Sequence, residues 1–264
     1  MSTDQPQARE MEAESMLRTL AAQAEALWPQ EQPLLAALGQ VAPSVLDVGC
    51  GSGEITTRLR RLHGDSAITG VDLFAPHLDI ARSQDPSIDY AVADARHLPF
   101  ADGAFDLVVC RHVLQAVPSA PAVLDELWRV CAPGGWVHML AEDYGMIHFP
   151  GEHLERFWLD GAVAFGKSAG CDLLSGRRVP AWLRGRAEDL RVHYLAVDTL
   201  RVPAATFGAI WTAWADGYAD GIAAATDLSR AVVDAAWAEM QATIEDPAAY
   251  AVWLVPVIQA RKPG

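Results

Sequence analysis

The chain of 264 residues is half hydrophobic (51%) and carries a formal net charge of −14 at pH 7. This length and apolar content suit one large domain, whereas the negative field repels phosphate backbones and argues against a nucleic-acid partner. The polar N-terminus has no secretory signal, no apolar run reaches about 18 residues, and the four cysteines lack zinc-site or disulfide-framework spacing, so we expect a cytoplasmic protein with no membrane contact and no bound metal.

Residues 1–43 are predicted to form an N-terminal helical arm. Leu17, Leu20, Ala24 and Leu27 are spaced by three and four, which is typical of a helix, and the ten residues before it are polar and predicted to be disordered. Trp28-Pro29 is expected to break this helix, because proline disfavours helical geometry at the residue before it. A second short helix over 33–38 then leads into the first strand.

A buried strand then runs into a glycine-rich turn. Val45, Leu46 and Val48 are followed directly by glycines at 49, 51 and 53, and a helical segment covers 54–62. Such a turn lets backbone approach a nucleotide-like ligand at a helix N-terminus. Glu54 stands where a dinucleotide fingerprint continues toward its third glycine, which disfavours a nicotinamide site. No Gly-Lys-Ser/Thr follows the turn, which excludes a P-loop.

Further strands and helices alternate after this turn. Strands are expected to end near 72, 93, 110 and 141, with helices over 76–83 and 120–131 between them. Alternation of this kind predicts an α/β fold with a doubly wound, mostly parallel sheet, whose ligand lies outside the carboxyl ends of the strands. Asp72 ends the second strand about twenty residues after the glycine turn, where an acid that binds ribose is expected.

The remainder of the chain elaborates this core. We expect a sixth strand over 190–200, a last strand over 250–260 and a helical insertion over 203–240, completing a seven-stranded sheet. Residues 44–142 would be the cofactor-binding core, and 143–264 the rest of the sheet with a helical cap, all in one integrated domain. Six of the nine tryptophans follow residue 150. They favour core packing, but an apolar lid over a substrate and a homodimer interface remain alternatives.

The sequence Val45-Leu-Asp-Val-Gly-Cys-Gly-Ser-Gly53, with Asp72, Asp94 and Ala132-Pro-Gly-Gly135 following in order, resembles the class I S-adenosyl-L-methionine-dependent methyltransferases. The resemblance is to the small-molecule type, similar to quinone-biosynthesis and natural-product enzymes. It implies a Rossmann-like fold, S-adenosyl-L-methionine as cofactor with S-adenosyl-L-homocysteine as product, and methyl transfer to an O, N or C atom of a small molecule. It also implies cofactor contacts from Gly49, Cys50, Gly51, Asp72, Leu73, Asp94 and Ala95, and Arg111 could hold the cofactor carboxylate through two hydrogen bonds. In this family the N-terminal arm often closes over the cofactor, although a helix that only packs on the sheet is an equal alternative.

Catalytic candidates should follow the fourth and fifth strands, because a hydroxyl or acidic carbon must lose a proton during methylation. His112 suits a base near neutral pH, Tyr144 could orient the acceptor, and His148 is a further candidate. The sequence Cys110-Arg-His-Val113 stands where enzymes that methylate DNA bases and protein amides have an Asn/Asp-Pro-Pro-Tyr/Phe motif, which disfavours those substrates. An S-adenosylmethionine-binding scaffold repurposed for a non-methylating role remains the alternative function.

Overall fold

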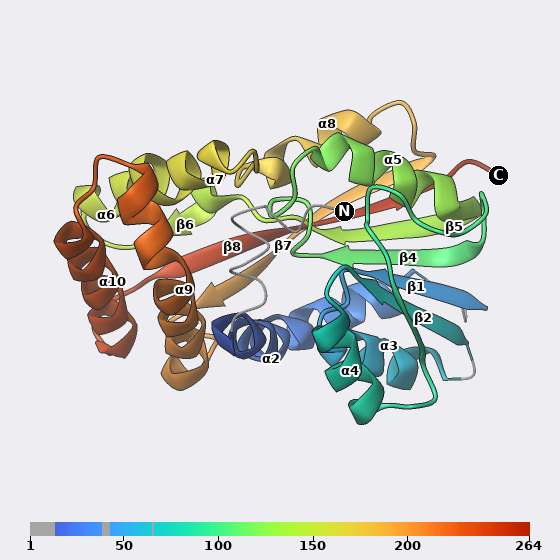
Figure 1. Cartoon of the computed structure of the whole chain (residues 1–264), viewed down its shortest axis with the longest axis horizontal. Coiled ribbons are helices and arrows are strands. Elements are labelled where there is room, and N and C mark those ends of the chain that lie inside the picture. The colour runs from blue at the N-terminus through green and yellow to red at the C-terminus, as the bar shows by residue number, and fades with distance from the viewer. Residues whose placement is uncertain (1–13, 39–42, 65) are drawn as a thin grey trace.

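The computed structural model describes residues 14–38, 43–64 and 66–264 and shows an eight-stranded mixed sheet in the order β3-β2-β1-β4-β5-β8-β6, with β7 also paired to β8 (Figure 1). Five strands are mutually parallel, and the three pairings made by β8 are antiparallel. The parallel strands are β1 (Ser44–Val48), β2 (Ala67–Asp72), β3 (Asp89–Val92), β4 (Phe105–Arg111) and β5 (Cys131–Leu140). The others are β6 (Ile147–His148), β7 (Asp189–Asp198) and β8 (Val252–Arg261).

The central strands are apolar because both faces of the sheet are covered by helices. In β1, Val45 pairs with Ile68 of β2 and Leu107 of β4, and all three side chains are buried. The helices α3 (Glu54–His63) and α4 (Ala75–Gln84) lie along one side, and α5 (Ala120–Val130) lies along the other with α8 (Val179–Leu183) (Figure 1). The expected doubly wound α/β fold is confirmed.

A helical insertion before the last strand is also confirmed. It consists of α9 (Ala204–Ala225) and α10 (Arg230–Glu245), which connect β7 to β8. A second helical stretch covers α6 (Glu152–Phe157), a π-helical turn (Trp158–Val163) and α7 (Ala164–Ser168). These segments gather at one end of the molecule around the outer halves of β7 and β8 (Figure 1), and their aromatic side chains form a core cluster separate from that beneath β1–β5.

Two sequence predictions about the elements are wrong. The sheet has eight strands instead of seven, because the two residues of β6 pair with Trp253 and Val252. The N-terminal arm is one helix, α2 (Glu14–Ala36), which continues through Pro29 and Pro33. Burial on both sides of Pro29 outweighs the local preference, since Trp28 is buried and the neighbouring turns are packed on the sheet. The ten residues predicted to be disordered lie outside the described part.

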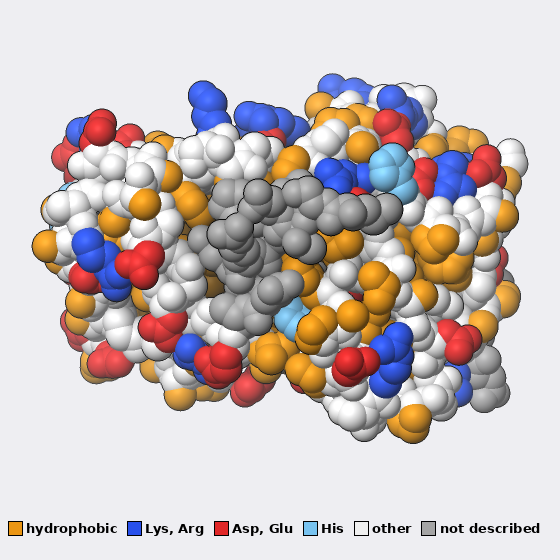
Figure 2. All heavy atoms as spheres, in the orientation of Figure 1, with side chains coloured by type: hydrophobic (Ala, Val, Ile, Leu, Met, Phe, Trp, Pro, Cys, Tyr) orange, Lys and Arg blue, Asp and Glu red, His pale blue; other side chains and the backbone are white. Residues whose placement is uncertain are grey.

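Acidic and basic side chains are interspersed on the face drawn in Figure 2. Two ion pairs join helices, Arg18 of α2 with Asp216 of α9 and Arg230 of α10 with Asp220 of α9, and Arg230 also pairs with Asp234 within α10. Within the residues that the structure describes, no helix has both the length and the apolar character needed to cross a bilayer.

Candidate functional site

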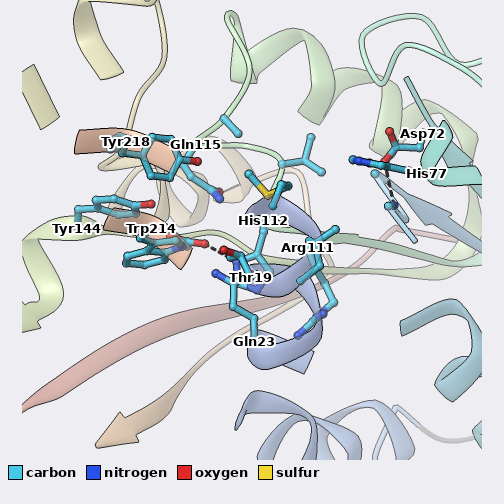
Figure 3. Close-up of a pocket in the computed structure, with 18 residues that line it drawn as sticks. Thr19, Gln23, Asp72, His77, Arg111, His112, Gln115, Tyr144, Trp214 and Tyr218 are labelled. Carbon is cyan, nitrogen blue, oxygen red and sulfur yellow. Dashed lines mark hydrogen bonds and ion pairs between the residues drawn. The ribbon is translucent and has the colours of Figure 1, made fainter. Parts of the chain in front are cut away.

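A cavity of about 660 Å³ lies outside the carboxyl ends of β1, β2, β4 and β5 (Figure 3). This is the edge at which open α/β sheets bind their ligands. Two helices close the remaining sides, α2 from the N-terminal arm and α9 from the insertion. They contribute Met16, Thr19, Leu20, Gln23, Trp214 and Tyr218. The first turns of α2 therefore cover the cavity, while its later turns pack against β7 and the sheet.

The glycine turn forms the floor of this cavity. The amides of Gly49 and Cys50 donate to the carbonyl of Val71 at 2.8 and 3.0 Å, which ties the turn to β2. Gly49 and Gly51 both have positive φ, at 72° and 53°. A Cβ on Gly49 would lie 2.2 Å from Val113, and one on Gly51 would lie 2.7 Å from Leu20. Only glycine satisfies both the conformation and the space.

Asp72 and His77 lie together on one side of the cavity (Figure 3). The carboxylate of Asp72 accepts hydrogen bonds from the amides of Gly51 and Phe74, each at 2.9 Å, and its burial raises the pKa of this carboxyl group. His77 is 4% exposed, and its Nε2 atom has no hydrogen-bond partner. The sequence analysis missed His77. Its position on the first turn of the helix that follows Asp72 is a signal that could have identified it.

Arg111 lines the cavity from the end of β4, but its guanidinium already has a partner. Its Nε donates to Glu31 Oε1 at 2.9 Å, and its Nη2 lies 2.9 Å from Glu31 Oε2. Glu31 also contacts His138 Nε2 at 3.0 Å, and Gln259 Nε2 lies 3.1 Å from His138 Nδ1. Because the Gln259 amide donates, His138 carries its proton on Nε2 and donates to Glu31. This buried network attaches α2 to the sheet.

His112 projects into the cavity from a strained backbone position. Its φ of 56° lies in the left-handed region, although its amide still donates to Leu140 at 2.9 Å as a continuation of β4. Its Nδ1 forms a short contact with Glu142 Oε1, and its buried Nε2 has no partner. Glu142 lies two residues beyond the end of β5 and is 2% exposed. Glu142 thus lies after the fifth strand, where catalytic candidates were expected, although no role was predicted for this residue.

Beyond His112 the cavity continues into an apolar compartment of roughly 350 Å³. Tyr144, Trp214 and Tyr218 face the shared boundary of the two spaces (Figure 3). Trp158 and Trp237 line the far end, with their rings perpendicular at 5.5 Å between centroids. Burial, followed by the charge of Glu142, raises the pKa of the Tyr144 phenol, so this group stays protonated near neutral pH. These aromatic side chains thus pack in the core and also line the cavity.

Several candidates lie outside this cavity. His148 is 53% exposed and contacts Glu155 on the surface, and Leu73 is exposed beside β2. Asp94 forms a two-pronged ion pair with Arg96, which lowers the pKa of Asp94, and neither it nor Ala95 lines the cavity. Cys50 lines a smaller space behind the glycine turn. Ligand contacts by these residues stay predictions.

The fold and this cavity define a Rossmann-like protein with a nucleotide-type site at the end of its parallel strands. Residues 46–139 match the methyltransferase domain family. A ubiquinone/menaquinone biosynthesis C-methyltransferase from Desulfotalea psychrophila is 38% identical over 96 residues, covering 36% of this chain and 39% of that protein. Residues 46–139 thus resemble a methyltransferase domain, and the similar proteins are methyltransferases for which S-adenosyl-L-methionine is the methyl donor.

The names of other similar proteins indicate different methyl acceptors. A malonyl-acyl-carrier protein O-methyltransferase from Pseudescherichia vulneris is 40% identical over 105 residues, which are 39% of this chain and 41% of that protein. The solved structure of phosphoethanolamine N-methyltransferase 2 from Haemonchus contortus, in complex with phosphomonomethylethanolamine and S-adenosylhomocysteine, has a TM-score of 0.56 at 19% identity. It covers 90% of this chain and 53% of that one. The chain spans about two fifths of the length of the curated relatives it matches.

Proposed function

We propose that this protein transfers a methyl group from S-adenosyl-L-methionine to a small-molecule acceptor by in-line displacement. The observation that carries the proposal is a pair of adjoining spaces that share Tyr144, Leu173, Trp214 and Tyr218 in their walls. One space, the polar end, has the glycine turn and the buried Asp72, and the other, the apolar end, is the aromatic compartment. Methyl transfer needs the donor and acceptor to be held in line and water to be excluded, and two adjoining spaces suit this requirement.

The polar end fits the cofactor in its residue chemistry. Backbone at Gly49 and Gly51 can approach a ligand closely. The two oxygens of Asp72 accept from the amides of Gly51 and Phe74, one each, which leaves capacity for ribose hydroxyls. Since Glu31 already engages Arg111, we propose that Arg111 supports the cofactor carboxylate as a shared positive charge. When bound, the cofactor supplies an activated methyl group on a sulfonium.

The apolar end fits a small acceptor. Its walls are predominantly aromatic, as is typical of pockets for small apolar ligands. The protonated phenol of Tyr144 can donate a hydrogen bond that orients the acceptor, and His112 Nε2 can accept a proton from it. The strongly negative chain argues against nucleic acid as the acceptor. A cytoplasmic location and a homodimer stay predictions from the sequence.

Isothermal titration with S-adenosyl-L-homocysteine tests the cofactor site. Wild-type protein should bind, Asp72→Ala should bind at least tenfold more weakly, and Asp79→Ala should match the wild type because Asp79 is exposed on the outer side of α4. Absence of binding, or equal binding by Asp72→Ala, would contradict the proposal. Formation of S-adenosyl-L-homocysteine with an acceptor panel then separates an enzyme from a scaffold that binds the cofactor without turnover.

A further inference from the structure

We propose that Glu142 is a positioning residue that fixes the tautomer of His112, so that the pair accepts a proton from the acceptor. This inference rests on the proposed function and narrows its substrate class to protic acceptors, meaning those whose reacting atom carries a hydrogen that must leave. The starting observation is the contact between His112 Nδ1 and Glu142 Oε1 beside the cavity.

The tautomer follows from the charge of the carboxylate. An ionised carboxylate only accepts hydrogen bonds, so it selects the histidine form that carries its proton on Nδ1. The lone pair then resides on His112 Nε2, which is buried and has no hydrogen-bond partner among the described residues. The side chain of His112 is 9% exposed and lines the cavity, so this lone pair is protected from bulk water.

The surroundings of Glu142 hold it in place for this task. Its carbonyl accepts from the Gly176 amide at 3.0 Å and from the Ser175 hydroxyl at 3.3 Å, which fixes the loop after β5. The next residue, Asp143, faces another way and pairs with Arg177 at 2.6 Å. Of two adjacent buried carboxylates, one is neutralised by an arginine, while the other is directed at a histidine in the cavity.

The backbone of His112 supports the same assignment. A non-glycine residue in the left-handed region costs about 1–3 kcal/mol and persists only where the surroundings enforce it. Here the hydrogen bond from the His112 amide to the carbonyl of Leu140 holds the chain in the sheet, while the side chain turns into the cavity. A surface loop would relax such strain. The conformation therefore points to a requirement for the imidazole at this place.

The proton balance of the reaction defines the acceptor. A bond forms between the acceptor atom and the methyl carbon as the carbon–sulfur bond breaks, and that electron pair stays on sulfur. The acceptor's bond to hydrogen also breaks, and its proton moves to His112 Nε2. The resulting imidazolium is stabilised by the carboxylate of Glu142. The proton then passes to solvent when the product leaves.

The first test is histidine ¹⁵N NMR on the full chain with S-adenosyl-L-homocysteine bound. We expect His112 to carry its proton on Nδ1 in the wild type and to lose this single tautomer in Glu142→Gln. Glu155→Gln is the matched control, because it removes the exposed His148–Glu155 contact and should leave His112 unchanged. A wild-type His112 protonated on Nε2, or unaffected by Glu142→Gln, overturns the inference whether or not an acceptor is known.

The second test compares 2-naphthol with 2-naphthalenethiol as acceptors for labelled methyl groups. The thiol ionises readily by itself, so only the hydroxyl needs a base. Glu142→Gln and His112→Asn should lower kcat for 2-naphthol at least tenfold with KM little changed, and should lower thiol methylation less than twofold. Equal losses on both acceptors, or wild-type transfer to the thiol alone, contradict the inference. No transfer to either, with the NMR result as expected, counts against the proposed function instead.

Discussion

Buried carboxyl groups near the cavity have opposite electrostatic environments. Asp47 lies behind the glycine turn, and burial raises its pKa to about 6, although Thr56 donates a hydrogen bond to it at 2.7 Å. For Glu31, burial acts to raise the pKa, but the charge of Arg111 and the contact with His138 outweigh it and lower the pKa to about 2. Ionised Asp47 thus opposes folding, and ionised Glu31 supports it.

Asp47→Asn should stabilise the protein in a pH-dependent way. Because the pKa of Asp47 is higher in the folded state (about 6) than in the unfolded state, the wild type loses stability as pH rises from about 4 to 6. The variant lacks this loss, so its advantage should grow across that window and stay constant above it, reaching at most about 3 kcal/mol. Urea unfolding at several pH values measures the difference. A constant difference from pH 4 to 8 would disprove this explanation.

Gly49→Ala should weaken cofactor binding at least tenfold. It adds a methyl group 2.2 Å from Val113 and forces an alanine into positive φ, so the turn must move. Gly64→Ala is the matched control, since Gly64 has a φ of 60° with no atom within 4 Å of the new Cβ. It should cost about 1 kcal/mol of stability without changing the affinity for S-adenosyl-L-homocysteine. Titration and thermal unfolding of both variants test this pair.

At the scale of elements, α2 connects the two halves of the molecule. Gln30 of this helix binds the backbone of Ala196 in β7 twice, at 2.9 and 3.1 Å, while Glu31 reaches β4 and β5 through Arg111 and His138. The same helix lines the cavity in its first turns. Its position over the cavity is therefore fixed from its second half.

Glu31→Ala should destabilise the protein by about 3–5 kcal/mol, because it leaves the Arg111 guanidinium buried without a counter-charge. Glu25→Ala on the exposed side of the same helix should cost less than about 1 kcal/mol, since Glu25 makes only an exposed contact with Thr206. Urea unfolding monitored by tryptophan fluorescence gives both values. Similar costs for the two variants would show that the buried network is not what holds α2.

The sequence predicted the parallel strands well because most of them are short apolar runs, and the first is followed directly by Gly49 while the second ends at Asp72. It failed at Trp28-Pro29, where local proline geometry was outweighed by burial of neighbouring side chains from distant elements. For the site, it identified the turn, Asp72 and His112, which follow strand ends. It could not predict that Glu31 would engage Arg111, because these residues are 80 positions apart.

At the scale of the whole molecule, the cavity joins segments that are far apart in the chain. Its walls come from α2, the glycine turn, the loops after β4 and β5, and α9. The matched family segment, 46–139, contains none of the residues that line the aromatic compartment. This separation explains why the sequence could indicate the cofactor while leaving the acceptor undefined.

Cofactor binding should therefore protect the amides of α2 and α9 from hydrogen exchange at the same time, although these helices are far apart in the sequence. We expect S-adenosyl-L-homocysteine to slow amide hydrogen exchange several-fold in the first turns of α2 and near Trp214 in α9, because both line the cavity. A ligand at 100 times its Kd should also add about 2.7 kcal/mol of stability. Helix α5 contributes no lining residue and serves as the internal control. Protection in the glycine turn without any in α2 would contradict this coupling.

The aromatic compartment has a practical consequence for engineering. All its lining residues lie between Tyr144 and Trp237, outside the matched segment 46–139. A chimera that keeps residues 14–142 but carries the α9–α10 hairpin of a relative should accept a different methyl acceptor while it retains the same methyl donor. Such an exchange would change the walls of the aromatic compartment while the glycine turn and Asp72 stay the same.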